Sequence, residues 1–256
     1  MTEVFFAAAG ALAVYMTAVF FLALRLQDNS IVDIAYGLAF LTAVSSAVLV
    51  HGASHARFLL LYAMVILWGL RLAAHLFIRH RGRGEDFRYR KWREEWGRNF
   101  LVRSFFQIYV LQGAVVLIVS SPVLAVAAEP GGPLGFLDAM GLGIWAVGLL
   151  FETVGDWQLL KFKKDPSNKG KIITTGLWRY TRHPNYFGEC TLWWGVFLVA
   201  LGSGGAWWTI ISPLTINFLL LYVSGIPMLE KKYEGDPVFE EYRRRTSPLV
   251  PWFPKV

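Results

Sequence analysis

The chain has 256 residues, of which 55% are hydrophobic and 17% are charged, and its formal net charge is +7. A soluble domain carries about 25% charged residues, so this composition excludes a disordered chain, a collagen-like chain and an ordinary soluble domain. It indicates a single bundle of membrane helices, each of which needs about 20 apolar residues. The single cysteine, Cys190, excludes a disulfide framework, and no cluster of Cys and His has zinc spacing, so no metal site is expected.

Taken in chain order, the apolar stretches predict an all-α integral membrane protein with seven transmembrane helices. The first stretch is too long for a removable signal peptide and lacks its basic start and small-residue cleavage site. No internal repeat or separate soluble domain interrupts the series, so residues 1–256 are expected to form one polytopic membrane domain. The expected spans are 4–24, 31–50, 58–78, 104–128, 139–160, 186–201 and 206–229.

Lysine and arginine residues set the expected orientation. Of the 25 in the chain, 22 lie in segments 79–103, 161–182 and 230–256, whereas the connections 129–138 and 202–205 hold none. Cytoplasmic loops carry the excess of Lys and Arg, so the N-terminus is expected outside and the C-terminus in the cytoplasm. The positive net charge follows from this topology and gives no argument for nucleic acid as a partner.

Ionisable residues from five of these spans fall in the cytoplasmic half of the membrane. Because a charge that faces lipid is costly, their shared depth favours a polar cavity open to the cytoplasm. Ion pairing between helices, such as Arg71 with Glu152, is the alternative. Arg71, His75 and Arg79 are spaced to share one helical face. The residues at this depth are Asp33, Arg71, His75, Glu152, Asp156, Glu189 and Glu230.

Two interpretations of Asp33 follow from its place at the start of the second span. Ser30 and Asp33 have the spacing of a capping box, in which each side chain bonds the backbone of the first helical turn. A carboxylate at this depth could equally belong to an active site. The spacing alone favours neither interpretation.

Two cytoplasmic loops are rich in residues that bind polar ligands. The loop 79–90 mixes Gly, Arg and aromatic residues, and guanidinium groups bind phosphate oxygens in pairs. The alternative is a positive-inside loop whose acidic residues are local counter-ions. In the segment 174–189, Pro184 suits a first helical turn, and Asn185, Tyr186 and Glu189 follow at a helix start that favours anions. Familiar nucleotide-binding glycine motifs are missing.

Several motifs resemble the DUF1295 family of membrane proteins, over roughly residues 25–254. This family is grouped with steroid 5α-reductases and, more distantly, with isoprenylcysteine carboxyl methyltransferases. The Arg-His-Pro-Asn-Tyr block at 182–186 is specific for the superfamily but not for one reaction. The matching motifs are 29–33, 68–71 with His75, 84–89, 176–189, 224–227 with Glu230, and 239–242.

The resemblance implies a membrane bundle that binds NADPH in its cytoplasmic half. Asp156, Asn185 and Glu189 match positions at which the reductases hold this cofactor, and Lys163 and Lys171 match basic residues near its adenosine phosphate. Asp33 matches a carboxylate that meets a steroid 3-keto group. The chain departs from the reductases where Val32 and Trp68 replace a Gln and a Tyr, and where Glu152 replaces an Asn.

The leading hypothesis is therefore NADPH-dependent reduction of the C=C bond of a 3-oxo-Δ4 steroid or similar lipophilic enone that enters from the bilayer. Its candidate catalytic residues are Asp33, Tyr36 and Trp68. Its candidate cofactor-binding residues are Arg71, His75, Arg79, Arg83, Glu85, Asp86, Arg88, Tyr89, Glu152, Asp156, Lys163, Lys171, Arg179, Tyr180, Arg182, His183, Asn185, Tyr186, Glu189 and Glu230.

Two alternatives come from other functional classes. One is an S-adenosylmethionine-dependent methyltransferase that acts on a lipid-like acceptor, and the other is a non-enzymatic lipid-binding or transport protein. Transporters usually show repeat symmetry and midplane sites, which this sequence lacks. A monomer surrounded by membrane lipids is expected, in a bacterial inner membrane rather than the endoplasmic reticulum.

Overall fold

The computed structural model describes residues 1–82 and 84–255, and these residues form helices joined by turns and loops. Strand pairing among the described residues is limited to one bridge between Thr181 and Ser247. The all-α class predicted from the sequence is confirmed. The chain divides into two compact units, the first made of 1–138 with 199–212 and the second of 139–198 with 213–256.

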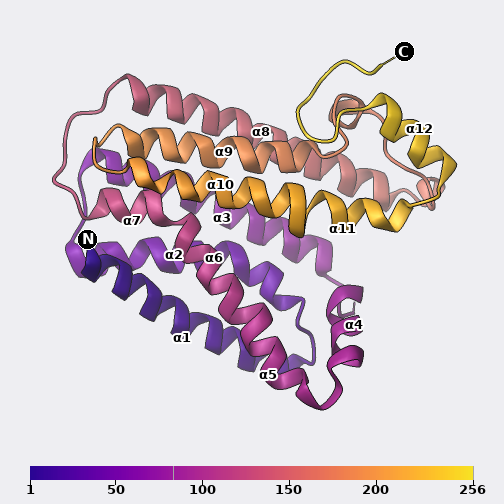
Figure 1. The fold of residues 1–256 in the computed structure, drawn as a ribbon, viewed down its shortest axis with the longest axis horizontal. Coiled ribbons are helices and arrows are strands. Elements are labelled where there is room, and N and C mark those ends of the chain that lie inside the picture. The colour runs from indigo at the N-terminus through magenta and orange to yellow at the C-terminus, as the bar shows by residue number, and fades with distance from the viewer. Residues whose placement is uncertain (83, 256) are drawn as a thin grey trace. The chain divides into compact units, whose positions relative to one another are not determined.

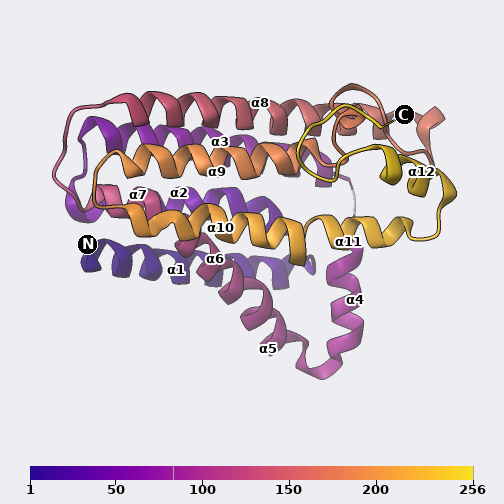
Figure 2. The same ribbon diagram turned by 45° about the horizontal axis from the view of Figure 1, so that its top comes forward.

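Long apolar helices dominate the first unit, where α2 packs against both α1 and α3 (Figures 1 and 2). Helices α2 and α3 approach most closely at two glycines. A Cβ atom on Gly37 would lie 2.4 Å from the carbonyl oxygen of Gly69, so only glycine allows this contact. These helices are α1 (Thr2–Leu26), α2 (Ile31–His51) and α3 (Ala56–His80).

The rest of the first unit turns sharply after α3. Helices α4 and α5 meet at a corner, and α5 continues through a π-helical turn into α6 (Figures 1 and 2). The sequence predicts one unbroken span over 104–128, but the helix ends before Ser120 and a new one begins. Pro122, in the first turn of the new helix, has no N–H to continue the preceding one. The elements are α4 (Phe87–Trp96), η1 (Gly97–Asn99), α5 (Phe100–Ser104), η2 (Phe105–Val110), α6 (Leu111–Val119), α7 (Ser121–Ala127) and η5 (Trp207–Ile210).

The two longest helices of the second unit pack closely at glycines. They are α8 (Phe136–Lys164) and α9 (Pro184–Leu201). A Cβ atom on Gly188 would lie 2.4 Å from the backbone nitrogen of Glu152, and one on Gly195 would lie 2.6 Å from the carbonyl oxygen of Gly141. Small residues allow membrane helices this close approach. Gly195 therefore packs directly against the backbone of α8.

The remaining chain of the second unit is more broken. After a π-helical turn, the helix is interrupted at Ser224 and Gly225, and the next helix carries Pro227 in its first turn. The elements are η3 (Pro166–Asn168), η4 (Gly176–Arg179), α10 (Ile211–Phe218), η6 (Leu219–Val223), α11 (Ile226–Glu230), η7 (Lys231–Tyr233) and α12 (Pro237–Arg245).

Six stretches of the described chain are long and apolar enough to cross a membrane, which supports an integral, multi-pass membrane protein. The expected seventh span, 186–201, lies in α9, which has 18 residues and is not among the six. A seventh crossing and the orientation of the chain stay predictions. The six stretches are Thr2–Leu26, Ile31–Val50, Ala56–His80, Phe87–Val119, Phe136–Lys164 and Trp207–Tyr233.

Candidate functional site

Asp33 lies in the first turn of α2, where both of its carboxylate oxygens accept hydrogen bonds from α4. Nη2 of Arg88 donates to Oδ2 at 2.7 Å, and the hydroxyl of Tyr89 donates to Oδ1 at 2.5 Å. Tyr89 is buried, whereas Arg88 and Asp33 keep partial contact with solvent. The carboxylate therefore fixes the first turn of α4 against the first turn of α2.

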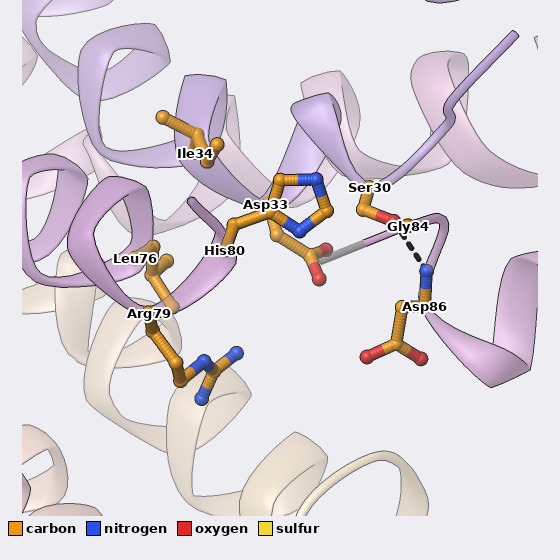
Figure 3. A pocket seen from close by; sticks show the side chains of 8 residues that line it. All are labelled: Ser30, Asp33, Ile34, Leu76, Arg79, His80, Gly84 and Asp86. Carbon is orange, nitrogen blue, oxygen red and sulfur yellow. Dashed lines mark hydrogen bonds between the residues drawn. The ribbon is translucent and has the colours of Figure 1, made fainter. Parts of the chain in front are cut away.

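The capping box predicted at Ser30 and Asp33 is wrong, because both side chains bond residues far away in the chain. The hydroxyl of Ser30 accepts the backbone N–H of Asp86 at 2.7 Å (Figure 3), and Asp33 bonds α4. The backbone N–H of Ser30 donates instead to Oδ1 of Asp28 at 2.8 Å. Asp28 thus makes the local turn that precedes α2.

Three more carboxylates surround Asp33, and each has a basic partner. Glu85 accepts two hydrogen bonds from Arg93, at 2.8 and 3.1 Å, and a third from the backbone N–H of Asn29. Asp86 accepts from Nε of Arg88 at 2.9 Å. The fourth carboxylate, Asp28, lies 2.8 Å from Nε2 of His80. This acidic and basic network joins the start of α2, the end of α3 and the start of α4.

Two carboxylates in the connecting loops have shifted pKa values. Burial acts to raise the pKa of Asp28, but hydrogen bonds from Ser30 and His80 outweigh it and hold that pKa below its usual value. The pKa of Asp86 is also lowered, because its hydrogen bonds from Arg88 outweigh the effect of burial. Both groups are therefore stabilised as carboxylates in the folded protein.

A cavity of about 80 Å³ lies inside this network (Figure 3). A cavity of this size holds several water molecules. The lining residues are Ser30, Asp33, Ile34, Leu76, Arg79, His80, Gly84 and Asp86.

The other candidates of the first unit lie on α2 and α3. The ring of Phe40 meets Tyr36 edge to face at 5.2 Å and Trp68 at 5.0 Å, and Trp68 is fully buried. Tyr36 and Trp68 thus pack in one row of aromatic rings. The remaining candidates on α3 are Arg71, His75 and Arg79, and Arg83 lies outside the described residues.

In the second unit, Arg182 and His183 both bond one carboxylate, that of Glu230. Arg182 donates to it at 2.8 and 3.2 Å, and Nε2 of His183 lies 2.9 Å from Oε1. Arg182 also donates to the carbonyl oxygens of Arg243 and Thr246. These three candidate cofactor residues therefore hold α11 and α12 against the chain that leads into α9.

Asp156 and Asn185 form a second polar contact in this unit. Nδ2 of Asn185 donates to Oδ1 of Asp156 at 3.2 Å. Oδ1 of Asn185 is buried and has no hydrogen-bond partner among the described residues. A buried acceptor without a donor is costly, so this oxygen is suited to bind a ligand N–H. Glu189 follows one helical turn later on α9.

Hydrogen bonds from η4 residues join the segment before α9 to α8. The indole N–H of Trp178 donates to the carbonyl oxygen of Gly155 at 3.2 Å, and the backbone N–H of Leu177 donates to Gln158 at 3.0 Å. Of the other candidates here, Glu152 is buried, and His183 stacks on Tyr186 with ring centroids 5.4 Å apart. Four candidates of the second unit are exposed, namely Lys163, Lys171, Arg179 and Tyr180.

Sequence reasoning missed several members of the network around Asp33. Asp28, His80 and Arg93 each bond a carboxylate or a basic group there, and the hydroxyl of Tyr109 donates to Oδ1 of the buried Asn29 at 2.8 Å. Tyr109 lies in the π-helical turn η2. The density of polar residues near the first loop was the available signal, and it does not identify partners. The single cavity expected from the sequence stays a prediction, since its residues divide between the two units.

Comparison with known proteins identifies the family. The family model described as "Protein of unknown function (DUF1295)" matches residues 19–246. The chain belongs to the DUF1295 family. The resemblance noted in its motifs is confirmed across most of its length.

Relatives of this DUF1295 protein match shorter regions. It is similar to "3-oxo-5-alpha-steroid 4-dehydrogenase 1" of Macaca fascicularis and of Homo sapiens, with 27% and 26% identity over 113 residues, which are 44% of this chain and 40% of each relative. It is 48% identical over 67 residues to "Probable O-methyltransferase ustE" of Ustilaginoidea virens, which are 26% of this chain and 22% of that protein. The matches thus span 40% or less of these relatives. No solved structure matches the chain.

Proposed function

We propose that this protein is an NADPH-dependent membrane oxidoreductase that reduces the C=C bond of a 3-oxo-Δ4 steroid or a similar lipophilic enone. The observation that carries the proposal is the similarity to two 3-oxo-5-alpha-steroid 4-dehydrogenases over 44% of the chain. Membership of the DUF1295 family, with its Arg-His-Pro-Asn-Tyr block, agrees with it. An apolar substrate would reach such a protein from the bilayer.

The residues around Asn185 fit the nicotinamide side of the cofactor. The buried Oδ1 of Asn185 needs a donor, and the carboxamide N–H of a nicotinamide is such a donor. Asp156 orients the Asn185 amide through the 3.2 Å hydrogen bond. We assign Asp156, Asn185 and Glu189 to the nicotinamide side, and the exposed Lys163 and Lys171 to the adenosine phosphate. Bound NADPH would supply the hydride for the reduction.

Residues of the Asp33 network are proposed to act on the substrate carbonyl. Negative charge develops on that oxygen during reduction, and a fixed hydrogen-bond donor lowers the barrier. The hydroxyl of Tyr89 carries a proton in direct contact with Asp33, which lines the cavity, and Arg88 holds the second oxygen of the same carboxylate. We assign proton donation to this pair: the Tyr89 proton passes through the Asp33 carboxylate to the substrate oxygen, and Arg88 stabilises the negative charge that is left behind. Tyr36 and Trp68 are assigned to the substrate pocket wall.

Turnover of an enone tests the proposal directly. Purified protein in lipid vesicles is incubated with NADPH and progesterone or testosterone, and the steroids are separated and identified by mass spectrometry. The expected result is the 5α-reduced product, formed only when NADPH is present. Absence of turnover with every enone offered would refute the reductase assignment.

Cofactor binding supplies a second test that needs no substrate. Replacing Asn185 or Glu189 with Ala is expected to weaken NADPH binding, measured by calorimetry, while the melting temperature changes little. Replacing Thr191 with Ala is the matched control. Thr191 lies further along α9, and its hydroxyl donates to the carbonyl oxygen of Phe187 in the same helix. Wild-type affinity in both Asn185→Ala and Glu189→Ala would leave these residues as helix-start structure.

A methyltransferase is the second candidate function, because the chain is 48% identical over 67 residues to the protein named "Probable O-methyltransferase ustE". It would transfer a methyl group from S-adenosylmethionine to a lipid-like acceptor. Mass spectrometry of the small molecules that co-purify with the protein separates the candidates. NADP(H) favours the reductase, S-adenosylmethionine favours the methyltransferase, and lipid without either cofactor favours a lipid-binding or transport protein.

A further inference from the structure

The chain that follows α12, Ser247–Lys255, exposes large apolar side chains outside the six apolar stretches. Val250, Trp252 and Phe253 are 58%, 70% and 76% exposed. Burial of such side chains is favourable, so three together favour a partner that covers them. We call Ser247–Lys255 the C-terminal segment.

The C-terminal segment is held in place by its backbone. Three hydrogen bonds of 2.9 Å fix it, from Arg182 N–H to Ser247, from Trp252 N–H to Tyr180, and from Lys255 N–H to Arg245. The ring of Phe253 also meets Tyr180, with centroids 6.1 Å apart. The apolar side chains therefore point outward from a fixed backbone.

The partners of the C-terminal segment place it at the end of a membrane helix. Tyr180 and Arg182 immediately precede α9, and the same block is bonded to α8 at Gly155 and Gln158. Beside these positions on α8, Trp157 is 57% exposed and the ammonium group of Lys161 lies 5.3 Å from its ring centroid. Exposed Trp beside Lys is typical of the membrane–water interface.

The composition of the C-terminal segment suits the same interface. It has no acidic residue, and three of its nine residues are proline, which has no backbone N–H to desolvate. The N–H groups of Trp252 and Lys255 are already bonded within the protein. Trp is favoured where an apolar ring meets polar headgroups, and Lys255 adds a cation for lipid phosphates.

We propose that the C-terminal segment is an interfacial membrane anchor. Trp252 and Phe253 insert at the boundary between headgroups and acyl chains, in the leaflet that surrounds Trp157 and Lys161 of α8. Val250 lies beside them. The segment thereby fixes the Tyr180–Arg182 chain to the membrane surface. The occupant of the apolar surface is the lipid bilayer.

Spin labels test this placement without any substrate. Cys190 is buried, so a new exposed cysteine can be labelled selectively. Phe253→Cys and, in a second variant, Val250→Cys carry nitroxides in lipid vesicles. Val238→Cys on α12, where the wild-type side chain is 65% exposed, is the matched control. Power saturation compares access to oxygen, which concentrates in acyl chains, with access to a water-soluble nickel chelate.

Labels in the C-terminal segment and the control label on α12 are expected to differ in their access to oxygen and to nickel. Labels at 250 and 253 should show a higher ratio of oxygen to nickel access than the label at 238. Equal ratios at all three sites would overturn the proposal, since the segment would then lie in water. Exclusion of both relaxing agents at 250 and 253 would also overturn it and indicate a second copy of the protein as the occupant. Unchanged melting temperatures establish that each labelled variant is folded.

Discussion

The hydroxyl of Tyr89 donates a 2.5 Å hydrogen bond to Oδ1 of Asp33, a residue 56 positions earlier in the chain. Arg88, the neighbour of Tyr89, occupies the other oxygen of the same carboxylate. One side chain of α2 thus holds the first turn of α4 in place. Because Asp33 also lines the cavity, a change at this residue affects both stability and any chemistry there.

Replacing Asp33 with Asn separates these two effects. The amide removes the charge that Arg88 faces, and hydrogen bonds to charged groups are worth about 1.5–3 kcal/mol, so the free energy of unfolding should fall by that amount. If the proposed acid–base role is correct, turnover of an enone should fall by about 100- to 10,000-fold. Melting curves and steady-state rates measure the two quantities on the same preparation.

Tyr89→Phe is the matched variant, because it keeps the carboxylate and its Arg88 partner. A loss of about 1.5–3 kcal/mol is expected, because the missing hydroxyl donates to a charged carboxylate. If the pair donates the proton, this variant should lose turnover as well, with NADPH binding unchanged. Wild-type turnover in both variants would contradict the assignment of the pair and leave Asp33 with a structural role.

Replacement of Glu230 tests the buried ion pair between Arg182 and Glu230 in the second unit. Arg182 is 7% exposed at its side chain, and Glu230→Ala would leave it buried without its counter-charge. Breaking such a pair costs about 3–5 kcal/mol. Chemical unfolding of the purified protein in detergent measures the loss. Glu241→Ala removes a carboxylate of similar charge from the exposed face of α12, where it pairs with Arg245, and should cost about 1 kcal/mol or less. Equal losses of stability in the two variants would contradict a stabilising role for the buried Arg182–Glu230 pair.

These two networks show where sequence reasoning succeeds in this protein and where it stops. Apolar runs predict α1, α2, α3 and α8 within a few residues, because length and composition alone decide a membrane helix. The capping box at Ser30 has the correct local spacing, but Asp86 offers the serine a better bond from 56 residues away. Local spacing carries no information on such a partner.

The second unit gives the same result. The Arg-His-Pro block is conspicuous in the sequence, yet its carboxylate partner is 47 and 48 residues later, beyond the break at Ser224 and Gly225. The helix breaks themselves carry local signals, since Pro122 and Pro227 stand in the first turns of the helices that follow them. The sequence therefore reveals which residues are polar, and the tertiary structure decides which of them meet.

Acid should weaken the network around Asp33. The pKa values of Asp28 and Asp86 are lowered in the folded protein from an ordinary value of 3.8, so folding is favoured while both are ionised. This contribution is fully present above the ordinary pKa and is lost as the pH falls through the lower folded values. Melting temperatures should therefore drop below about pH 4. Asp28→Asn with Asp86→Asn should flatten that drop, whereas Glu3→Gln in the exposed first turn of α1 should not.

The position of the chain ends tests the membrane topology. If α9 crosses the membrane together with the six longer stretches, the ends lie on opposite sides, with the C-terminus in the cytoplasm. Reporter tags fused before Thr2 and after Lys255 should then give opposite responses to a protease or a membrane-impermeant label. Both ends on one side would mean an even number of crossings and would exclude α9 as the seventh.

Gly188→Ala and Gly143→Ala are expected to change the stability of the protein in opposite directions. A Cβ atom on Gly188 would lie 2.4 Å from the backbone nitrogen of Glu152 and 2.5 Å from the carbonyl oxygen of Gly148. Backbone atoms cannot swing aside, so Gly188→Ala must push the helices apart, at a cost of about 1–3 kcal/mol or more. A Cβ atom on Gly143, also on α8, would meet no atom within 4 Å, and Gly143→Ala should stabilise the helix by about 0.5–1 kcal/mol.

The same displacement should reach the proposed cofactor residues. Gly188 lies between Asn185 and Glu189 on α9, and the 3.2 Å bond from Asn185 to Asp156 of α8 requires the two helices to stay close. Gly188→Ala is therefore expected to weaken NADPH binding as well as stability, whereas Gly143→Ala should leave binding unchanged. Calorimetry at a temperature where both variants are folded measures this difference. Equal affinity in the two variants would show that the α8–α9 contact does not position the cofactor residues.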